Sequence, residues 1–330
     1  AGAGAGKGGS KPVRQYMTKR ILYLIPTLFG ASLVIFFIFA LAPGDFLDSD
    51  LSLTPERAAE LRALYGLDRP ILERYFIWLG NALKGDFGYS LQYQQPVGAL
   101  LKEYVWNSFL IASVSLVLTW TIAVAVGVFS AVRQYSWYDS LITLGVFAAM
   151  SFPPFFIGLL LIKLFAVDLG WLPIGGMTNT GSQSTGFAYV WEVAEHMILP
   201  STVLTMLSVG SLTRHFRANM IDVIRLDFVR TARAKGLKEK TVVYKHALRN
   251  ALLPAITLFG LELPGLFSGA IITERIFNWP GVGNMHMEAI AHRDYTVLMG
   301  FTLFLTFLTV LGNLLADWLY AVADPRIRYK

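Results

Sequence analysis

The sequence predicts an all-α membrane protein with six transmembrane helices and with both termini in the cytoplasm. Of its 330 residues, 55% are hydrophobic and only 15% are charged, against about 25% charged residues in an ordinary soluble domain. Several apolar runs reach membrane-spanning length. The basic residues gather in alternate connections between these runs, which is typical of membrane topology and not of nucleic-acid binding.

Six apolar runs are candidate transmembrane spans. At a rise of 1.5 Å per residue, most of them cross a hydrocarbon core of ~30 Å. The fourth run is the weakest, because it is short and contains Pro200. The expected spans are residues 20–42, 108–132, 141–167, 197–213, 252–273 and 297–321.

The distribution of Lys and Arg predicts the orientation of the chain. Residues 1–20 contain five of them and no acid, residues 168–196 contain none, and residues 214–251 contain ten against three acids. Cytoplasmic connections carry the excess of basic residues. We therefore expect 43–107, 168–196 and 274–296 outside, and 133–140, 214–251 and both termini inside.

The expected domain organisation is simple. Residues 1–16 are rich in Gly and Ala and predict a flexible tail. Residues 17–330 form one transmembrane domain with an extracytoplasmic helical insertion at 43–107 and a cytoplasmic loop at 214–251.

The insertion contains signals for two short helices. Thr54 before Pro55 is typical of an N-cap and a first helical position, and Gly66 of a helix end. A second helix is expected from Pro70 to Gly85. The insertion is either a surface hairpin without function or a docking site for an external partner.

The sequence lacks the motifs of several enzyme classes. It has no cysteine, no GxxxxGK[ST], no HExxH and no GxSxG. His286 and His292 are six residues apart, a spacing that does not place two ligands on one helical face. We therefore expect no enzyme, no metal site and no cofactor in this chain.

Glu262 is the ionisable residue nearest the middle of an expected span, where a charge costs ~3 kcal/mol or more. Pro264 and Gly265 are expected to loosen the helix beside it. Two interpretations stay open: Glu262 lines a translocation path, or it is a protonated or helix-paired carboxyl with a packing role.

The basic loop 214–251 has a helical pattern. Phe216, Met220 and Val223 recur at helical spacing, and "VRTARAKG" then ends a second helix at Gly236. "LKEKTVVYKHALRN" resumes the pattern into the fifth span. A short helix ended by glycine, with the small residues Ala232 and Ala234, could enter a groove of another protein. The alternative is a solvated loop that only sets topology.

Two stretches of this loop, "RTARAKGL" at 230–237 and "HALRNALLP" at 246–254, resemble the cytoplasmic EAA loop of ABC importer permeases. The chain is similar to the dipeptide/oligopeptide/nickel permease family, on its dipeptide-permease B side, which implies a type I importer fold. Further matches are "LAPGD" at 41–45, "GLDRP" at 66–70, "ERIFNWPGVG" at 274–283, "RDY" at 293–295 and "DPRIR" at 324–328.

The resemblance implies a coupling helix at 227–236 that inserts into a cleft of a separate ATPase subunit. Arg230, Thr231 and Ala232 stand where the general motif has Glu-Ala-Ala. Because that Glu is missing, a salt bridge assigned to it cannot be carried over. The implied ATPase-coupling residues are Asp227, Arg230, Thr231, Ala232, Arg233, Ala234 and Gly236.

The resemblance also implies the partners and the location. These are a second homologous permease subunit, two ATP-binding subunits that hold ATP and Mg²⁺, an extracytoplasmic solute-binding protein and the lipid bilayer, with no nucleic acid. The location is the cytoplasmic membrane of a prokaryote, and the expected substrates are peptides.

Two other functions compete with this hypothesis. An ion-coupled secondary transporter would use Glu262 as a proton or ion relay, but it gives the long basic loop no role. An intramembrane hydrolase would need a Ser/His or carboxylate pair at one depth, which Glu262 alone does not provide.

Overall fold

The computed structural model describes residues 10–44, 46–49, 54–262, 265–266, 268 and 270–323, and most of them are helical. The chain divides into two compact units. Unit 1 comprises residues 1–108, 267–271 and 281–330, and unit 2 comprises residues 109–266 and 272–280. The expectation of a single domain over 17–330 stays a prediction.

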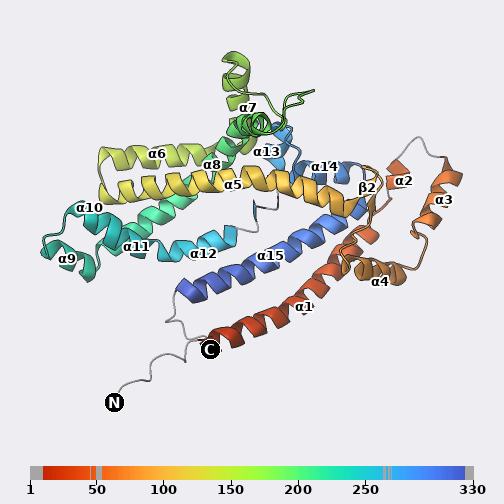
Figure 1. The fold of residues 1–330 in the computed structure, drawn as a ribbon, viewed down its shortest axis with the longest axis horizontal. Coiled ribbons are helices and arrows are strands. Elements are labelled where there is room, and N and C mark those ends of the chain that lie inside the picture. The colour runs from red at the N-terminus through yellow and green to blue at the C-terminus, as the bar shows by residue number, and fades with distance from the viewer. Residues whose placement is uncertain are drawn as a thin grey trace. The chain divides into compact units, whose positions relative to one another are not determined.

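Unit 1 is built on two long helices, α1 (Ser10–Ala40) and α15 (Tyr295–Ala323), which lie side by side (Figure 1). Helix α1 begins at Ser10, within the segment expected to be a flexible tail. The other elements of unit 1 are α2 (Phe46–Ser49), α3 (Pro55–Leu64), α4 (Ile71–Ala82), β1 (Tyr89–Ser90), β2 (Gln95–Pro96), the beginning of α5 (Val97–Val132) and α14 (Val282–Ala291).

The helical insertion has the two helices expected from its capping signals. The Thr54 side chain accepts a hydrogen bond from the Arg57 amide, and Pro55 is the first residue of α3. Gly66 follows with a φ of +66°, a conformation that glycine adopts without strain. The sequence did not predict the small antiparallel pair of β1 and β2, nor that α5 begins at Val97, before the expected span at 108.

The "RDY" motif forms the corner where α14 meets α15. Asp294 is buried and accepts hydrogen bonds from Ser90 Oγ at 2.6 Å, from the Gln92 amide at 3.2 Å and from the Val297 amide at 3.3 Å. One carboxylate therefore caps α15 and fastens the β1–β2 turn to it. Nearby, Tyr93 donates a hydrogen bond to Glu288 at 2.7 Å, and burial together with this carboxylate raises the pKa of Tyr93.

Unit 2 contains the rest of α5 and a series of helices that follow it in the chain. These are α6 (Trp137–Ser151), α7 (Pro154–Leu161), η1 (Ile162–Asp168), α8 (Phe187–Ile224), α9 (Asp227–Ala234), α10 (Glu239–Thr241), η2 (Val242–Ala247), α11 (Leu248–Ala251), α12 (Leu253–Glu262) and α13 (Ile271–Ile276).

Two expected spans are not single helices. The third, 141–167, is divided between α6, α7 and η1, and the break falls at Phe152, whose extended backbone precedes Pro153 and Pro154. Proline lacks an amide donor and disfavours the helical conformation in the residue before it. The fifth span, 252–273, is divided between α12 and α13, and Pro264 lies outside the described residues.

Helix α8 is much longer than the fourth expected span, 197–213. It takes in the end of the expected outer loop and the first part of the basic loop, and Pro200 lies inside it. Membrane helices tolerate proline where neighbouring groups satisfy the freed carbonyl. The weak span of the sequence is therefore the middle of one long helix.

Four helices of the described chain are long and apolar enough to cross a membrane. They cover Leu22–Ala40, Val97–Val132, Phe187–Ile224 and Tyr295–Leu315. Each includes or overlaps one of the six expected spans.

A close crossing of α5 and α8 depends on Gly127. A Cβ at this position would lie 2.8 Å from Phe216 Cβ and 3.0 Å from the Thr213 carbonyl oxygen. We expect Gly127→Ala to lower the melting temperature in detergent, because overpacking costs roughly 1–3 kcal/mol. The matched control is Gly145→Ala in α6, where a Cβ meets nothing within 4 Å and alanine favours the helix. Equal melting temperatures of the two variants would contradict this crossing.

Candidate functional site

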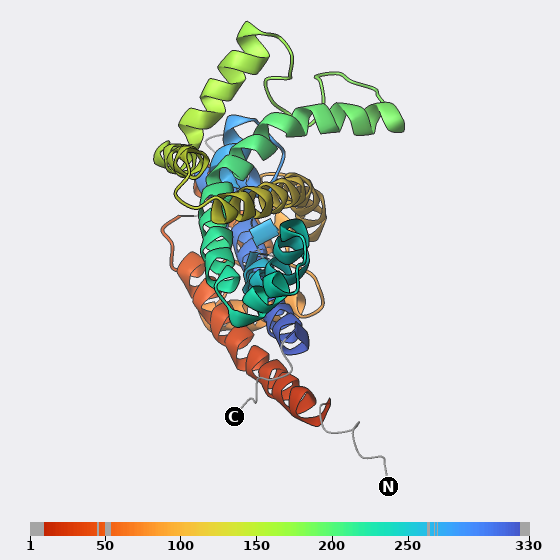
Figure 2. The ribbon, with the colours of Figure 1, turned by 90° about the vertical axis from the view of Figure 1, so that its left-hand side faces the viewer.

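The basic loop contains the predicted short helix, α9, and it ends as predicted. Leu226 precedes it in extended conformation, and Asp227 lies in its first turn. The Lys235 amide donates to the Thr231 carbonyl at 3.0 Å, and the Gly236 amide donates to that of Arg233 at 2.9 Å. Gly236 has a φ of +73°, so the chain turns sharply there. Figure 1 shows α9 beside α10, and the same end faces the viewer in Figure 2.

One face of α9 is buried within unit 2. Val229 is 0% exposed and Ala232 is 6% exposed. They pack in a core cluster of nine buried residues contributed by α5, α8, α9, η2 and α11, namely Val128, Ala131, Met220, Val229, Ala232, Val242, Val243, Ala247 and Ala251. This corrects one expectation: Ala232 was grouped with Ala234 as a small residue for close approach to a partner, but it faces the chain's own core.

The other residues predicted to couple to an ATPase are exposed. Arg230 contacts Asp227 at 3.4 Å, and the Thr231 hydroxyl donates to the Asp227 carbonyl at 2.9 Å. Arg233 forms two hydrogen bonds with Glu239, at 2.7 and 3.2 Å, and its guanidinium lowers the pKa of Glu239. Exposed pairs of this kind add little stability, but this one ties α9 to α10 across the Gly236 turn.

Four large apolar side chains are exposed around α9, and the sequence reasoning did not identify them as a group. Val229 and Ala232, three residues apart, account for the buried face of α9. Further apolar residues in the same stretch of sequence could therefore have indicated an exposed apolar surface. They are Leu226 at 49%, Phe228 at 40%, Leu237 at 40% and Tyr244 at 56% exposure. We call this set the α9 apolar patch.

An ion pair near the core cluster joins three helices, and the sequence did not predict it. Arg217 of α8 donates to Asp139 of α6 through Nε at 2.9 Å and through Nη2 at 2.7 Å. Ser130 of α5 also donates to Asp139 and accepts from Arg217 at 3.0 Å. Hydrogen bonds from Arg217 hold the pKa of Asp139 well below its ordinary value. The network fixes the ends of α5 and α6 to α8.

Glu262 lies apart from α9 and has a hydrogen-bond partner. Trp120 of α5 donates its indole N–H to Glu262 at 2.7 Å, and the Trp120 ring lies edge-on to Phe216 and Phe259. This hydrogen bond joins α12 to α5, and the packing role of Glu262 stays a prediction. A role in a translocation path stays a prediction.

Residues 123–329 match the family described as "Binding-protein-dependent transport system inner membrane component". Among curated relatives, the oligopeptide transport system permease protein AppB of Bacillus subtilis is 41% identical over 317 residues, which cover 95% of this chain and 99% of that one. The glutathione transport system permease protein GsiC of Escherichia coli (strain K12) is 37% identical over 319 residues, covering 96% and 99%.

A solved structure of the MetNI methionine ABC transporter in inward-facing conformations shares the fold. Its TM-score is 0.54 at 17% sequence identity, and the match covers 68% of this chain and 96% of that one. At this identity the match shows the fold alone, whereas the sequence match covers more than half of the chain. The chain therefore belongs to the family of inner-membrane components of binding-protein-dependent transport systems, and it is a multi-pass permease subunit.

Proposed function

We propose that the chain is the peptide-importing permease subunit of an ABC transporter and that α9 receives force from a separate ATPase subunit. The observation that carries this proposal is the two-sided character of α9. Val229 and Ala232 pack into a core shared with α5, α8, η2 and α11, whereas Arg230, Arg233 and the residues of the α9 apolar patch are exposed. A helix held in this way can transmit a push to the bundle.

The composition of the exposed side suits a protein interface. Aromatic and Arg side chains are enriched among residues that dominate binding energies, and the exposed residues in and around α9 include Phe228, Tyr244, Arg230 and Arg233. Gly236 sets the angle at which the chain leaves α9. An acidic cleft lined by apolar residues is the complementary surface.

The Asp139–Arg217 pair extends this rigid connection. It fastens α8, whose Met220 contacts the core under α9, to the ends of α5 and α6. A displacement of α9 would therefore move three apolar helices together. Such helices can alternate between two packed arrangements that ATP binding by the partners would favour unequally.

The proposed partners and orientation follow from the family and from charge. ATP and Mg²⁺ would bind to two ATPase subunits, a second homologous permease would complete the path, and a solute-binding protein would deliver substrate on the outer side. The excess of Lys and Arg in residues 214–251 supports a cytoplasmic position for α9 in a bacterial plasma membrane.

Peptides are the proposed substrates because the named relatives are an oligopeptide and a glutathione permease. The competing hypothesis of an ion-coupled secondary transporter is not supported, because the chain's family is one of binding-protein-dependent importers. Glu262 would then serve the packing of α12 on α5, or line the path beside Trp120.

We expect Phe228→Glu to reduce the amount of ATPase subunit that copurifies with this chain. The change places a charge in the α9 apolar patch, and desolvating an unpaired charge in an interface is costly. The matched control is Leu64→Glu, since Leu64 is 76% exposed on α3, in the insertion expected outside the membrane. Equal copurification of both variants with the ATPase would contradict the proposed interface.

A further inference from the structure

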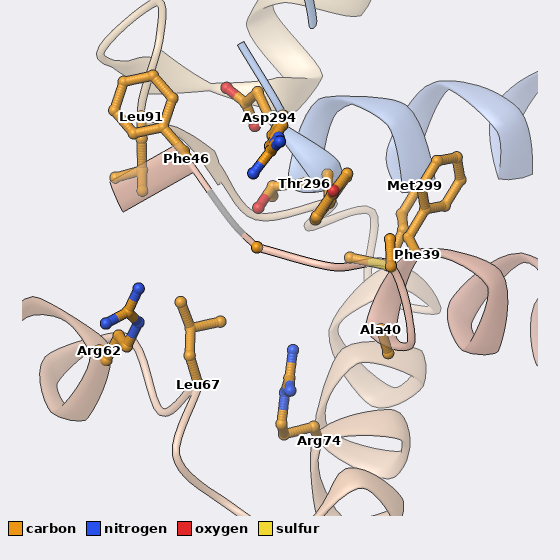
Figure 3. A pocket seen from close by; sticks show the side chains of 14 residues that line it. Phe39, Ala40, Phe46, Arg62, Leu67, Arg74, Leu91, Asp294, Thr296 and Met299 are labelled. Carbon is orange, nitrogen blue, oxygen red and sulfur yellow. The ribbon is translucent and has the colours of Figure 1, made fainter. Parts of the chain in front are cut away.

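Unit 1 contains a basic pocket that the transport function does not explain. Its volume is about 360 Å³, and Figure 3 shows Arg62 and Arg74 directed into it. Arg293, from the "RDY" corner, also lines it. The other lining residues are Phe39, Ala40, Ala42, Gly44, Phe46, Leu67, Leu91, Asp294, Tyr295, Thr296 and Met299.

The pocket lies at the ends of two membrane-crossing helices. The apolar span in α1 ends at Ala40 and that in α15 begins at Tyr295, and both residues line the pocket. The ring of Tyr295 lies 5.9 Å from that of Phe39. Amphipathic rings at the end of a span are typical of the headgroup level of a bilayer. The arginines are therefore at the depth of lipid phosphates.

Helix α4, which carries Arg74, is suited to the membrane interface. Tyr75 is buried on one side of α4, and its hydroxyl lies 2.9 Å from Ser32 Oγ of α1. On the same helix, Leu72 is 60% exposed and Phe76 is 64% exposed. Because a helix with exposed apolar residues beside a polar face can lie in the headgroup region, Arg74 is held between α1 and the lipid surface.

Two of the arginines have no partner for their charge in the part of the chain that the structure describes. Neither Arg74 nor Arg293 forms a side-chain hydrogen bond or an ion pair there. Among the described residues that line the pocket, Asp294 is the one acid, and its oxygens accept hydrogen bonds from Ser90 and from backbone amides. The pocket therefore offers fork-shaped donors suited to phosphate.

Unit 1 also contains an apolar groove, and the helices that line it, α1, α4 and α15, also contribute residues to the pocket. The groove has a volume of about 580 Å³ and is formed by α1, α4, α15 and the turn after α4. On α1 the groove residues are Ile25 to Ser32, and the pocket begins at Phe39. At 1.5 Å per residue, the groove residues of α1 lie roughly 10–20 Å from Phe39, whereas Leu303 of the groove lies only about 6 Å along α15 from Met299 of the pocket. The groove therefore continues from the pocket into the membrane over up to about 20 Å. That distance matches the length of a lipid acyl chain.

We propose that unit 1 holds an anionic phospholipid, with its phosphate between Arg74 and Arg293 and an acyl chain in the apolar groove. A free phosphate would use the same arginines but not the groove. The inference needs the chain to cross a membrane, and it is independent of the role of α9.

The test measures lipid retained by the assembled transporter in detergent, using native mass spectrometry after addition of phosphatidylglycerol or phosphatidylcholine with identical chains. Both lipids offer the same phosphate, but the choline cation of phosphatidylcholine would be repelled by Arg74 and Arg293, so we expect phosphatidylglycerol to bind roughly tenfold tighter. The double variant Arg74→Gln/Arg293→Gln should lose this preference. The matched control is Arg57→Gln/Arg69→Gln, which removes arginines of the same insertion that pair with Glu60 and Glu73.

Two further arms keep the test decisive. Inorganic phosphate should not displace the lipid, and complete displacement would assign the pocket to free phosphate and overturn the proposal. Photoactivatable phosphatidylglycerol should label the wild-type chain within residues 39–46 or 293–299. Because this experiment uses the wild-type chain, its result does not depend on whether a variant folds. Equal binding of both lipids, an unchanged preference in the double variant, or labelling only elsewhere would also overturn it.

Discussion

Gly236→Val is expected to abolish ATP-dependent uptake while leaving the chain inserted in the membrane. Gly236 has a φ of +73°, and a β-branched residue in that region costs of order 1–3 kcal/mol. A Cβ there would meet nothing within 4 Å, so the strain lies in the backbone of the turn and not in crowding. The turn should open and change the angle of α9. Transport assays in vesicles and membrane fractionation measure the two outcomes.

The control for this prediction is Gly236→Asn, because asparagine tolerates the left-handed conformation better than other residues. This variant should retain most of the uptake. Normal transport by the valine variant would show that the geometry of the turn is not needed. Equal loss in both variants would show that the added side chain itself, and not the backbone, is the cause.

Asp139→Leu is expected to destabilise unit 2 by about 3 kcal/mol, the lower end of the cost of removing one partner from a buried ion pair. The lower end applies because the Arg217 side chain is 28% exposed, whereas that of Asp139 is 6% exposed. The melting temperature in detergent should fall, and uptake should fall with it, since the pair joins α5, α6 and α8.

A double-mutant cycle separates the ion pair from the packing of each side chain. Asp139→Leu/Arg217→Met removes both charges, so it should be more stable than the sum of the single changes implies. Additive losses would mean that the two residues act independently.

The same pair predicts how stability depends on pH. Arg217 lowers the pKa of Asp139 in the folded state, so the stabilisation is complete above the unfolded pKa of about 3.9. It is lost only as the pH falls from there toward the folded pKa. The difference in stability between wild type and Asp139→Leu should therefore stay constant from about pH 6 to pH 8.

The sequence predicted those parts of the fold that depend on local signals. Thr54 and Pro55 begin α3, and Gly236 ends the turn of α9, because a cap or a left-handed residue acts on its immediate neighbours. The long apolar runs of α1 and α15 were equally clear. The resemblance to importer permeases predicted the family, and the match of residues 123–329 to the family of inner-membrane transport components confirmed it.

The parts that could not be predicted depend on contacts between distant segments. Periodicity gave no reason to pair Asp139 with Arg217, 78 residues apart, or Trp120 with Glu262, 142 residues apart. Sequence reasoning also placed Ala232 on a partner-facing surface. The buried face of a short amphipathic helix depends on the neighbouring helices that cover it, and the sequence pattern does not show these neighbours. The length of helix α8 was underestimated, because its ends are polar and only its apolar middle was expected to form a span.

The central claim is that α9 lies on the cytoplasmic side and touches an ATPase subunit. The chain has no native cysteine, so Ala234→Cys, at an exposed position of α9, introduces a single thiol. In the assembled transporter it should react with an impermeant thiol reagent only from the cytoplasmic side, and it should cross-link to the ATPase. A Leu64→Cys control should react from the opposite side and give no such product. Labelling of Ala234→Cys from the outside, or an accessible thiol that never cross-links to the ATPase, would contradict the account.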